Sequence, residues 1–158
     1  MSSNNNLVYD YMRLSKIFIK ENDSIFSAFE LFKKHNLKRI LVIKEDFSVL
    51  GCISQDELKK YFKQDVNDQD ILKKTKINEL NIQYDSPVFI YPKMGITDAY
   101  SIMKYFNVKY LPVLDVPWEK RIIGFLWVED ILSVIKKNCF NVPVATSLQT
   151  IEKRQAYC

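Results

Sequence analysis

Glycine is scarce in this chain of 158 residues, which has only Gly51, Gly95 and Gly124. Three isolated glycines exclude a P-loop and a dinucleotide-binding fingerprint, because both need several glycines within a few residues. Histidine is scarcer still, with His35 as the single example. A histidine-based metal site or catalytic triad therefore has almost no material, and we expect no metal ligands.

Catalytic motifs are absent as well. The sequence contains neither HExxH nor GxSxG, and it offers no pair of inward carboxylates beside a nucleophile. We therefore predict that the chain is not an enzyme, has no catalytic residues and needs no cofactor for chemistry.

Cysteine and long apolar runs are also lacking. Cys52, Cys139 and Cys158 are too few and too scattered for a disulfide framework. No apolar run approaches the ~18 residues of a membrane helix, and the start of the chain lacks the apolar core of a signal peptide. We expect a cytoplasmic protein, or the soluble part of something larger, without direct membrane insertion. The net charge of +4 is mild and its signs are interspersed, which favours a solvated surface over a nucleic-acid interface.

One sequence pattern occurs twice. Residues 37–58 read LKRILVIKEDFSVLGCISQDEL, and residues 108–131 read VKYLPVLDVPWEKRIIGFLWVEDI. Each copy has a short apolar run, a polar loop, a glycine inside a second apolar run, and an acidic residue that opens a helical pattern. Self-similarity at a fixed period predicts a repeat architecture.

Apolar periodicity predicts the same elements in each copy. The first copy is expected to contain a strand, a helix capped by Asp23 or Ser24, two strands and a second helix, at residues 17–19, 25–36, 39–43, 49–54 and 55–63. The second is expected to contain a strand, a helix capped by Thr97, two strands and a final helix, at residues 88–91, 97–106, 110–114, 122–127 and 129–137. Short turns are expected at residues 7–12 and 77–80.

The fold class that follows is α/β, with two β-α-β-β-α repeats packed with pseudo-twofold symmetry. A single repeat of ~55 residues buries too little surface to be stable alone, so we predict that the two face each other, with clefts where they meet. The predicted divisions are repeat 1, a connector, repeat 2, and a tail or docking segment, at residues 7–64, 65–76, 77–137 and 138–158.

The paired motifs resemble the tandem CBS domain, or Bateman module. The first copy supplies RILV at residues 39–42 and GCISQDE at 51–57, and the second supplies YLPV at 110–113 and GFLWVED at 124–130. The resemblance spans about residues 7–137. It implies a regulatory module that senses an adenine nucleotide (AMP, ADP or ATP) in an inter-repeat cleft and signals to a partner enzyme or transporter. The alternative is a ligand-free CBS-fold module for dimerisation or interaction.

The resemblance also implies how a nucleotide would be held. An Asp at a helix start accepts both ribose hydroxyls, a hydroxyl three residues earlier suits phosphate, and the glycine lets a ligand approach the backbone. The second copy keeps Asp130 but has Trp127 in place of the hydroxyl, and whether Trp127 stacks on a base or blocks the phosphate stays open. The first copy keeps Ser54 but has the longer Glu57 in place of Asp, so we expect the Asp130 cleft to dominate.

The nucleotide-binding residues implied by the resemblance come from both repeats: Asp130, Trp127, Phe125, Lys109, Lys38, Arg39, Leu37, Ile17, Met12, Ser54 and Glu57. Simpler explanations exist for the charged members. The helix dipole favours acidic residues in a first turn, and basic residues at strand edges promote solubility.

A homodimer is a further expectation. The predicted helix faces look too apolar to be used up in one core, with Leu58, Tyr61 and Phe62 in one repeat and Ile131, Leu132 and Ile135 in the other. A surplus apolar patch marks an interface, and a closed twofold is the commonest symmetry of soluble oligomers.

Overall fold

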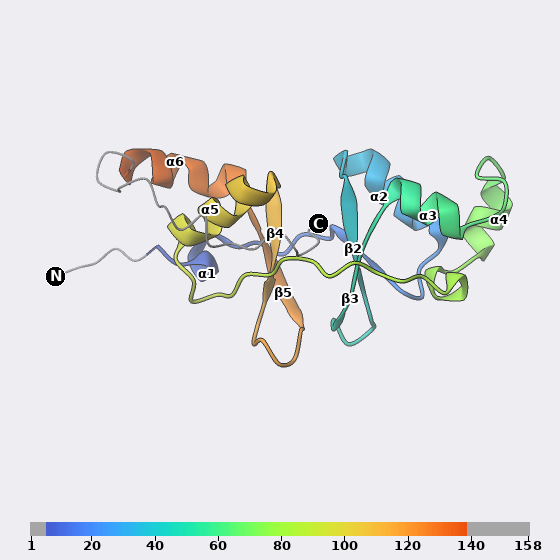
Figure 1. Ribbon diagram of the computed structural model, residues 1–158, viewed down its shortest axis with the longest axis horizontal. Helices are drawn as coiled ribbons and strands as arrows, with labels where there is room; N and C mark the ends of the chain where they lie inside the picture. The colour runs from blue at the N-terminus through green and yellow to red at the C-terminus, as the bar shows by residue number, and fades with distance from the viewer. Residues whose placement is uncertain (1–5, 139–158) are drawn as a thin grey trace. The chain divides into compact units, whose positions relative to one another are not determined.

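The computed structural model describes residues 6–138, so the predicted tail lies almost entirely outside the described residues. The described chain forms two compact units, which Figure 1 shows in ribbon form. We call residues 16–87 the Glu57 unit, and residues 6–15 with 88–138 the Asp130 unit. The predicted α/β class is confirmed in both.

The Glu57 unit contains a three-stranded sheet in the order β1-β2-β3, with β1 parallel and β3 antiparallel to β2. Its elements are β1 (Phe18–Lys20), α2 (Ile25–His35), β2 (Arg39–Ile43), β3 (Val49–Ser54), α3 (Gln55–Tyr61), α4 (Gln69–Lys74) and the 3₁₀ turn η1 (Ile77–Leu80). The first repeat therefore has the predicted β-α-β-β-α order.

Local signals explain where α2 begins and ends. The Ser24 side chain accepts the N–H of Ser27 at 3.1 Å, and this settles the predicted choice of cap in favour of Ser24. Asn36 ends the helix in the left-handed conformation with φ 49°. The apolar side of α2, with Ile25, Ala28 and Phe32, is buried in the core of the unit.

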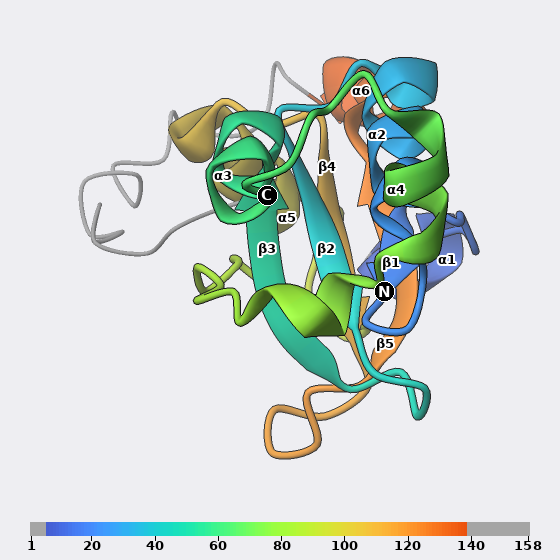
Figure 2. The same cartoon turned by 90° about the vertical axis from the view of Figure 1, so that its right-hand side faces the viewer.

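Helix α4 was missing from the prediction, which assigned residues 65–76 to a connector. The Asp68 side chain caps it by accepting the N–H groups of Asp70 and Ile71, and Leu72 is buried in the core. Figure 2 shows α4 beside α2. The helix was overlooked because it has only six residues, too few for an apolar period to be visible.

The Asp130 unit contains the antiparallel hairpin β4-β5 and three α-helices. Its elements are α1 (Val8–Tyr11), α5 (Ile96–Phe106), β4 (Tyr110–Leu114), β5 (Ile122–Trp127) and α6 (Val128–Asn138). The predicted cap Thr97 was wrong, because it lies inside α5 and Gly95 occupies the cap position without a side-chain hydrogen bond.

The predicted strand at residues 88–91 is reduced to one parallel bridge between Ile90 and Val113. Its two hydrogen bonds are Ile90 N–H to Pro112 O at 3.1 Å and Leu114 N–H to Ile90 O at 2.9 Å. Extending the ladder in either direction would need an N–H group from Pro112 or Pro92, and proline has none. In the Glu57 unit, Glu21 occupies the place of Pro92, and its N–H does bind Ile43 O at 2.9 Å.

A lead-in segment opens each predicted repeat, at residues 6–15 in the first and 81–87 in the second, and joins the unit formed by the rest of the other repeat. Arg13 and Phe125 exchange two backbone hydrogen bonds of 2.9 Å, which adds the first lead-in to β5. Cys52 and Asp85 do the same at 2.9 and 3.1 Å, which adds the second lead-in to β3. The predicted boundaries at 7–64 and 77–137 therefore describe the sequence repeats and differ from the compact units.

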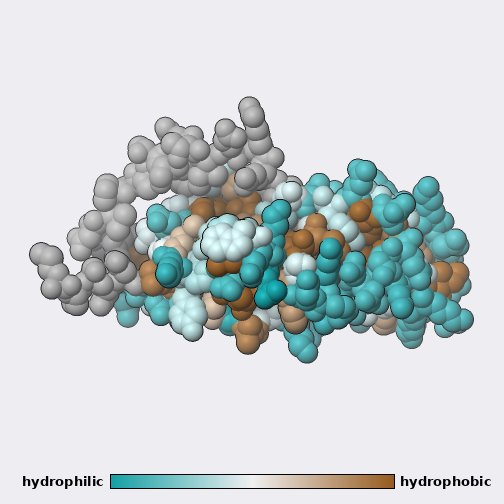
Figure 3. Space-filling model, turned by 90° about the horizontal axis from the view of Figure 1, so that it is seen from below, coloured by the Kyte–Doolittle hydropathy of each residue, from teal (hydrophilic) through white to brown (hydrophobic). Residues whose placement is uncertain are grey.

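The helix faces that suggested a dimer are largely used within the units. Leu58 and Phe62 are buried in one core, and Ile131 and Ile135 are buried in the other. On the face shown in Figure 3, hydrophobic atoms form separate patches on the Glu57 unit. Tyr61 and Leu132 are partly buried, so less apolar surface is left for an interface than the sequence suggested, and the homodimer stays a prediction.

Candidate functional site

The acidic position of the Glu57 unit belongs to a capping box at the start of α3. The Ser54 hydroxyl accepts the N–H of Glu57 at 3.2 Å, and the Glu57 carboxylate accepts the N–H of Ser54 at 2.8 Å. This reciprocal pair satisfies two helix N–H groups that would otherwise lack partners. The predicted hydroxyl and carboxylate are therefore already engaged with the backbone.

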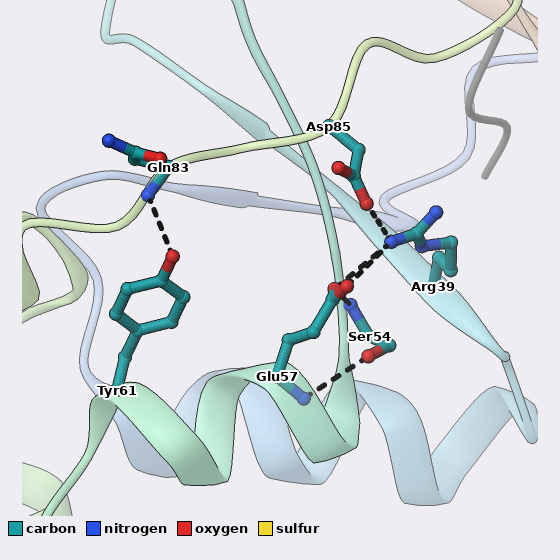
Figure 4. Close-up of polar contacts among 6 residues, drawn as sticks. All are labelled: Arg39, Ser54, Glu57, Tyr61, Gln83 and Asp85. Carbon is teal, nitrogen blue, oxygen red and sulfur yellow. Dashed lines mark hydrogen bonds and ion pairs between the residues drawn. The ribbon is translucent and has the colours of Figure 1, made fainter. Parts of the chain in front are cut away.

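Arg39 joins two carboxylates in the same unit, as Figure 4 shows. Its Nη2 donates to both carboxylate oxygens of Glu57 at 3.0 Å and also to Oδ2 of Asp85. Partial burial opposes the charge of Arg39, but the hydrogen bond to Glu57 and the nearby carboxylates raise the pKa of Arg39 above its ordinary value. Because Arg39 is already held by two acids in this structure, it is a poor source of positive charge for a phosphate.

The second lead-in is fixed on this unit at three places. Asp85 pairs with Cys52 on β3 and with Arg39 on β2. The N–H of Gln83 lies 3.4 Å from the Tyr61 hydroxyl on α3 (Figure 4). The polar groups around Glu57 therefore hold the chain together locally, and this is the function that their contacts support.

We predict that replacing Glu57 by Gln lowers the free energy of unfolding at pH 7 by about 1 kcal/mol. Partial burial alone would raise the pKa of Glu57, but the Ser54 N–H and Arg39 hold it below its ordinary value. A lowered folded-state pKa means that the stabilisation is present above the ordinary value of about 4.3 and is lost as the pH falls through the folded pKa. Urea unfolding of both proteins from pH 7 to pH 3 should therefore give converging stabilities.

Asp56→Asn is the matched control, because Asp56 is an exposed acid in the same first turn. It should leave a much smaller pH-dependent difference. A Glu57→Gln penalty that is the same at pH 3 and pH 7 would contradict the ionic role of Glu57.

The acidic position of the Asp130 unit has a different partner. Asp130 and Glu129 lie in the first turn of α6, and Arg13 of the first lead-in contacts both. Arg13 Nε lies 2.9 Å from Asp130 Oδ2, and Arg13 Nη2 lies 2.5 Å from Glu129 Oε1. The Asp130 side chain is 33% exposed and that of Arg13 is 45% exposed, although the Oδ2 atom that faces Arg13 is itself buried.

Trp127 lies under the same guanidinium. The Arg13 Cζ is 5.0 Å from the centre of the indole ring, a cation–π distance. The indole N–H donates to Ser15 Oγ at 3.3 Å, and the ring is tilted by 36° against Tyr110 with the centroids 5.0 Å apart. Trp127 is therefore oriented by the first lead-in and by β4.

In each unit one arginine pairs with the acidic residue at the helix start, but the two arginines occupy different positions in the repeat. The pairings Arg39–Ser54 and Tyr110–Trp127 end equivalent hairpins, so Tyr110 takes the place of Arg39. The pairings Cys52–Asp85 and Phe125–Arg13 make the lead-ins equivalent, so Arg13 takes the place of Asp85. The arginine thus comes from the strand in one unit and from the lead-in in the other.

Gly51 and Gly124 occupy equivalent positions in the two hairpins, and a backbone segment lies close to each of them. A Cβ at Gly51 would lie 2.7 Å from Asp85 O, and one at Gly124 would lie 3.3 Å from Arg13 O. The lead-in backbone therefore lies close to both glycines. The expectation that these glycines also let a ligand approach the backbone stays a prediction.

The structure brings together only part of the predicted set within each unit. The Asp130 unit contains Met12, Lys109, Phe125, Trp127 and Asp130, and the Glu57 unit contains Ile17, Leu37, Lys38, Arg39, Ser54 and Glu57. Phe125 and Ile17 are fully buried core residues, whereas Lys38 and Lys109 are exposed.

Leu37 lines a surface groove of about 620 Å³ among α2, α3 and α4. Neither Ser54 nor Glu57 lines this groove, so its position does not match the predicted nucleotide site.

Three residues of these sites were missed by sequence reasoning: Arg13, Asp85 and Glu129. Arg13 and Glu129 are 116 residues apart in the chain, and no local pattern relates them. A signal was present in the repeat alignment, because charged residues of opposite sign, Arg13 and Asp85, precede the two copies at similar distances.

Among residues 6–138, no three His, Cys, Asp or Glu side chains gather in a way that could hold a metal ion. No helix within these residues has the length and apolar character needed to cross a membrane.

Comparison with known proteins shows a similarity to CBS-domain proteins. A family model described as the CBS domain matches residues 8–64. A CBS domain-containing protein of Dictyostelium discoideum is 26% identical over 141 residues, which are 87% of this chain and 96% of that protein.

Solved structures agree in fold. A CBS domain pair in complex with 5′-methylthioadenosine and S-adenosyl-L-methionine is 22% identical with a TM-score of 0.55, over 84% of this chain and 98% of that one. CBSX2 in complex with AMP is 20% identical with a TM-score of 0.57, over 84% and 97%. The CBS domain of a bacterial CNNM/CorC family Mg²⁺ transporter in complex with ATP is 16% identical with a TM-score of 0.55, over 83% and 87%.

Proposed function

We propose that this chain, which belongs to the CBS-domain proteins, is a non-catalytic regulatory module that binds an adenine nucleotide at Asp130. The observation that supports this most directly is the Asp130 carboxylate in the first turn of α6, which shares its partner Arg13 with the indole ring of Trp127. A carboxylate at this place can accept both hydroxyls of a ribose. An aromatic ring a few residues away can stack on a base.

The Asp130 unit fits such a ligand better than the Glu57 unit does. Asp130 is partly exposed, and its structural partner is a single flexible side chain, Arg13. Glu57 is bound to the Ser54 N–H and to Arg39, so a ribose would have to break a helix cap and an ion pair together. We infer that nucleotide binding, where it occurs, is dominated by Asp130.

Arg39 is held by Glu57 and Asp85, so we propose that other residues supply the positive charge for the phosphates. Lys109 is exposed in the Asp130 unit, and its carbonyl accepts the N–H of Val128 at the start of α6 at 2.8 Å. We propose that its ammonium contacts a ligand phosphate. Contributions of Lys38, Arg39, Leu37 and Ile17 to the ligand remain predictions.

The ligands of the similar structures support an adenosine-containing molecule. AMP, ATP, 5′-methylthioadenosine and S-adenosyl-L-methionine share the adenosine group and differ in what is attached to it. A ribose-binding carboxylate and a base-stacking ring recognise the shared part. We expect the attached group to decide which of them this chain prefers.

The test is a thermal and chemical unfolding panel with AMP, ADP, ATP, 5′-methylthioadenosine and S-adenosyl-L-methionine, with GMP and CMP as controls. A ligand at 100 times its Kd should add about 2.7 kcal/mol to the free energy of unfolding. Stabilisation by adenosine compounds alone supports the proposal. Absence of any shift at millimolar concentrations would move the assignment to the alternative.

That alternative is a CBS-fold interaction module without a nucleotide. One observation favours it: Arg13 already binds Asp130 and covers Trp127 in the structure. In this case Arg13 is a permanent structural partner, as Arg39 is for Glu57. Under either function the proposed partner is an enzyme or transporter that responds to the module, or a second copy of the chain in a homodimer.

A further inference from the structure

Arg13 contacts each group in the Asp130 unit that the proposed nucleotide site would need. Its guanidinium lies against Asp130, against Glu129 and over the ring of Trp127. A ribose needs the Asp130 carboxylate, and an adenine needs the Trp127 ring. The same positively charged side chain therefore competes with both parts of an adenosine.

The backbone of Arg13 is held by hydrogen bonds, while its side chain is partly exposed. Two hydrogen bonds of 2.9 Å to Phe125 hold the backbone on β5. The side chain is 45% exposed and ends in contacts with two partly exposed acids. Surface ion pairs of this kind contribute little to stability, so the guanidinium can exchange partners by rotating about its side-chain bonds.

We propose that Arg13 is an internal competitor that sets the phosphate selectivity of the Asp130 site. When a ribose takes the Asp130 carboxylate, the guanidinium leaves Asp130 and Trp127 and binds the ligand phosphate. This inference rests on the proposed function, because it needs a nucleotide at Asp130.

The local charge explains why the exchange selects phosphorylated ligands. Two carboxylates, Asp130 and Glu129, face one guanidinium, so this cluster has a formal charge of −1. Adenosine would displace the cation and offer it no new anion. A nucleotide offers its phosphate, with which arginine forms charge-assisted and often bidentate hydrogen bonds. The displaced guanidinium can keep Glu129 with either ligand, but it regains a second anionic partner only when the ligand has a phosphate.

In the Glu57 unit, by contrast, the arginine is held too firmly to exchange its carboxylate partners for a phosphate. Arg39 belongs to a strand and is only 20% exposed, and its partner Glu57 also accepts the Ser54 N–H. Removing that arginine from its acids would disturb the cap of α3 and the contact with Asp85. The contacts of the Arg13 side chain with Asp130 and Glu129 are ion pairs in the first turn of α6, and they involve no capping box like that of Ser54 and Glu57.

The experiment compares adenosine with AMP in wild type and in Arg13→Ala. Both proteins have the background substitution Trp118→Phe, which removes an exposed tryptophan (79%) and leaves Trp127 as the only tryptophan. Tryptophan fluorescence then reports exchange at the Trp127 ring, and calorimetric titration gives the affinities. Arg121→Ala is the matched control, because Arg121 lies in the same unit, is 51% exposed and forms one weak ion pair at 3.8 Å.

We expect Arg13→Ala to bind adenosine roughly tenfold more tightly than wild type does, since the lost ion pairs and cation–π contact no longer compete. Its affinity for AMP should change little, because the lost competition and the lost phosphate contact oppose each other. The preference for AMP over adenosine should therefore fall about tenfold. Arg121→Ala should keep the wild-type preference.

The outcomes separate this inference from the proposed function. Wild type that binds AMP, together with an unchanged preference in Arg13→Ala, would overturn the role of Arg13 and leave the function standing. Adenosine binding by Arg13→Ala alone would support the competition directly. Failure of every variant to bind adenosine or AMP would overturn the function and this inference with it. Arg13→Gln replaces Arg13→Ala if the latter does not fold.

Discussion

Replacing Gly51 by alanine is expected to lower the free energy of unfolding by roughly 2–4 kcal/mol. Gly51 has φ 150°, a conformation that strains any residue with a Cβ atom. The added methyl would also press on Tyr84 Cβ, and it would lie 2.7 Å from the carbonyl oxygen of Asp85. Backbone atoms cannot move aside as the end of a flexible side chain can, so the second lead-in would have to separate from β3.

Gly124→Ala is the matched control for this prediction. Gly124 has no strained φ, and an added Cβ would meet Arg13 O and Met12 Sδ at 3.3 Å. A cost of about 1 kcal/mol or less is expected, because the Met12 side chain can shift. Urea unfolding gives both values, and faster hydrogen exchange at the Cys52 and Asp85 amides should accompany the Gly51 change. Equal costs at the two glycines would contradict the close contact with the second lead-in.

The strands of both hairpins were predictable from sequence. Each is a short apolar run bounded by charged loop residues, and the predicted limits 39–43, 49–54, 110–114 and 122–127 match the structure. The repeat itself removed most of the remaining ambiguity, because each copy supported the assignment of the other. The strand at 88–91 failed for a reason visible only in the register, since Pro112 lies opposite it and lacks an N–H group.

The sequence predicted the residues at the helix starts, Ser54, Glu57, Trp127 and Asp130, but not the partners that they have in the structure. Asp130 and Glu57 were found because each opens a helix at the same place in its repeat. Their arginine partners were not assigned. Arg13 is far from Asp130 in the sequence although the two are in contact in the structure, and Arg39 had been predicted to bind a phosphate. Which cation meets which carboxylate depends on how the lead-ins cross the hairpins, and local sequence does not encode this crossing.

Asp130→Ala is expected to weaken AMP and ATP binding about ten- to a hundredfold. The substitution leaves two ribose hydroxyls without their acceptor, a loss of roughly 1.5–3 kcal/mol. Part of that loss is offset, because the change also frees Arg13 from one of its two acids. Calorimetric titration of AMP and ATP measures the effect. A double-mutant cycle with Arg13→Ala separates the lost acceptor from the lost competitor.

Glu57→Ala is the comparison that locates the site. Glu57 is engaged with Ser54 and Arg39, so its removal should reduce stability and change nucleotide affinity much less than Asp130→Ala does. Glu57→Asp shortens the side chain by one methylene, and we expect it to weaken the capping box and offer a second ribose acceptor. Unchanged affinity in folded Asp130→Ala would place the ligand elsewhere. An Asp130→Ala loss that disappears in the Arg13→Ala background would mean that the carboxylate acts by holding Arg13 and not by accepting ribose hydroxyls.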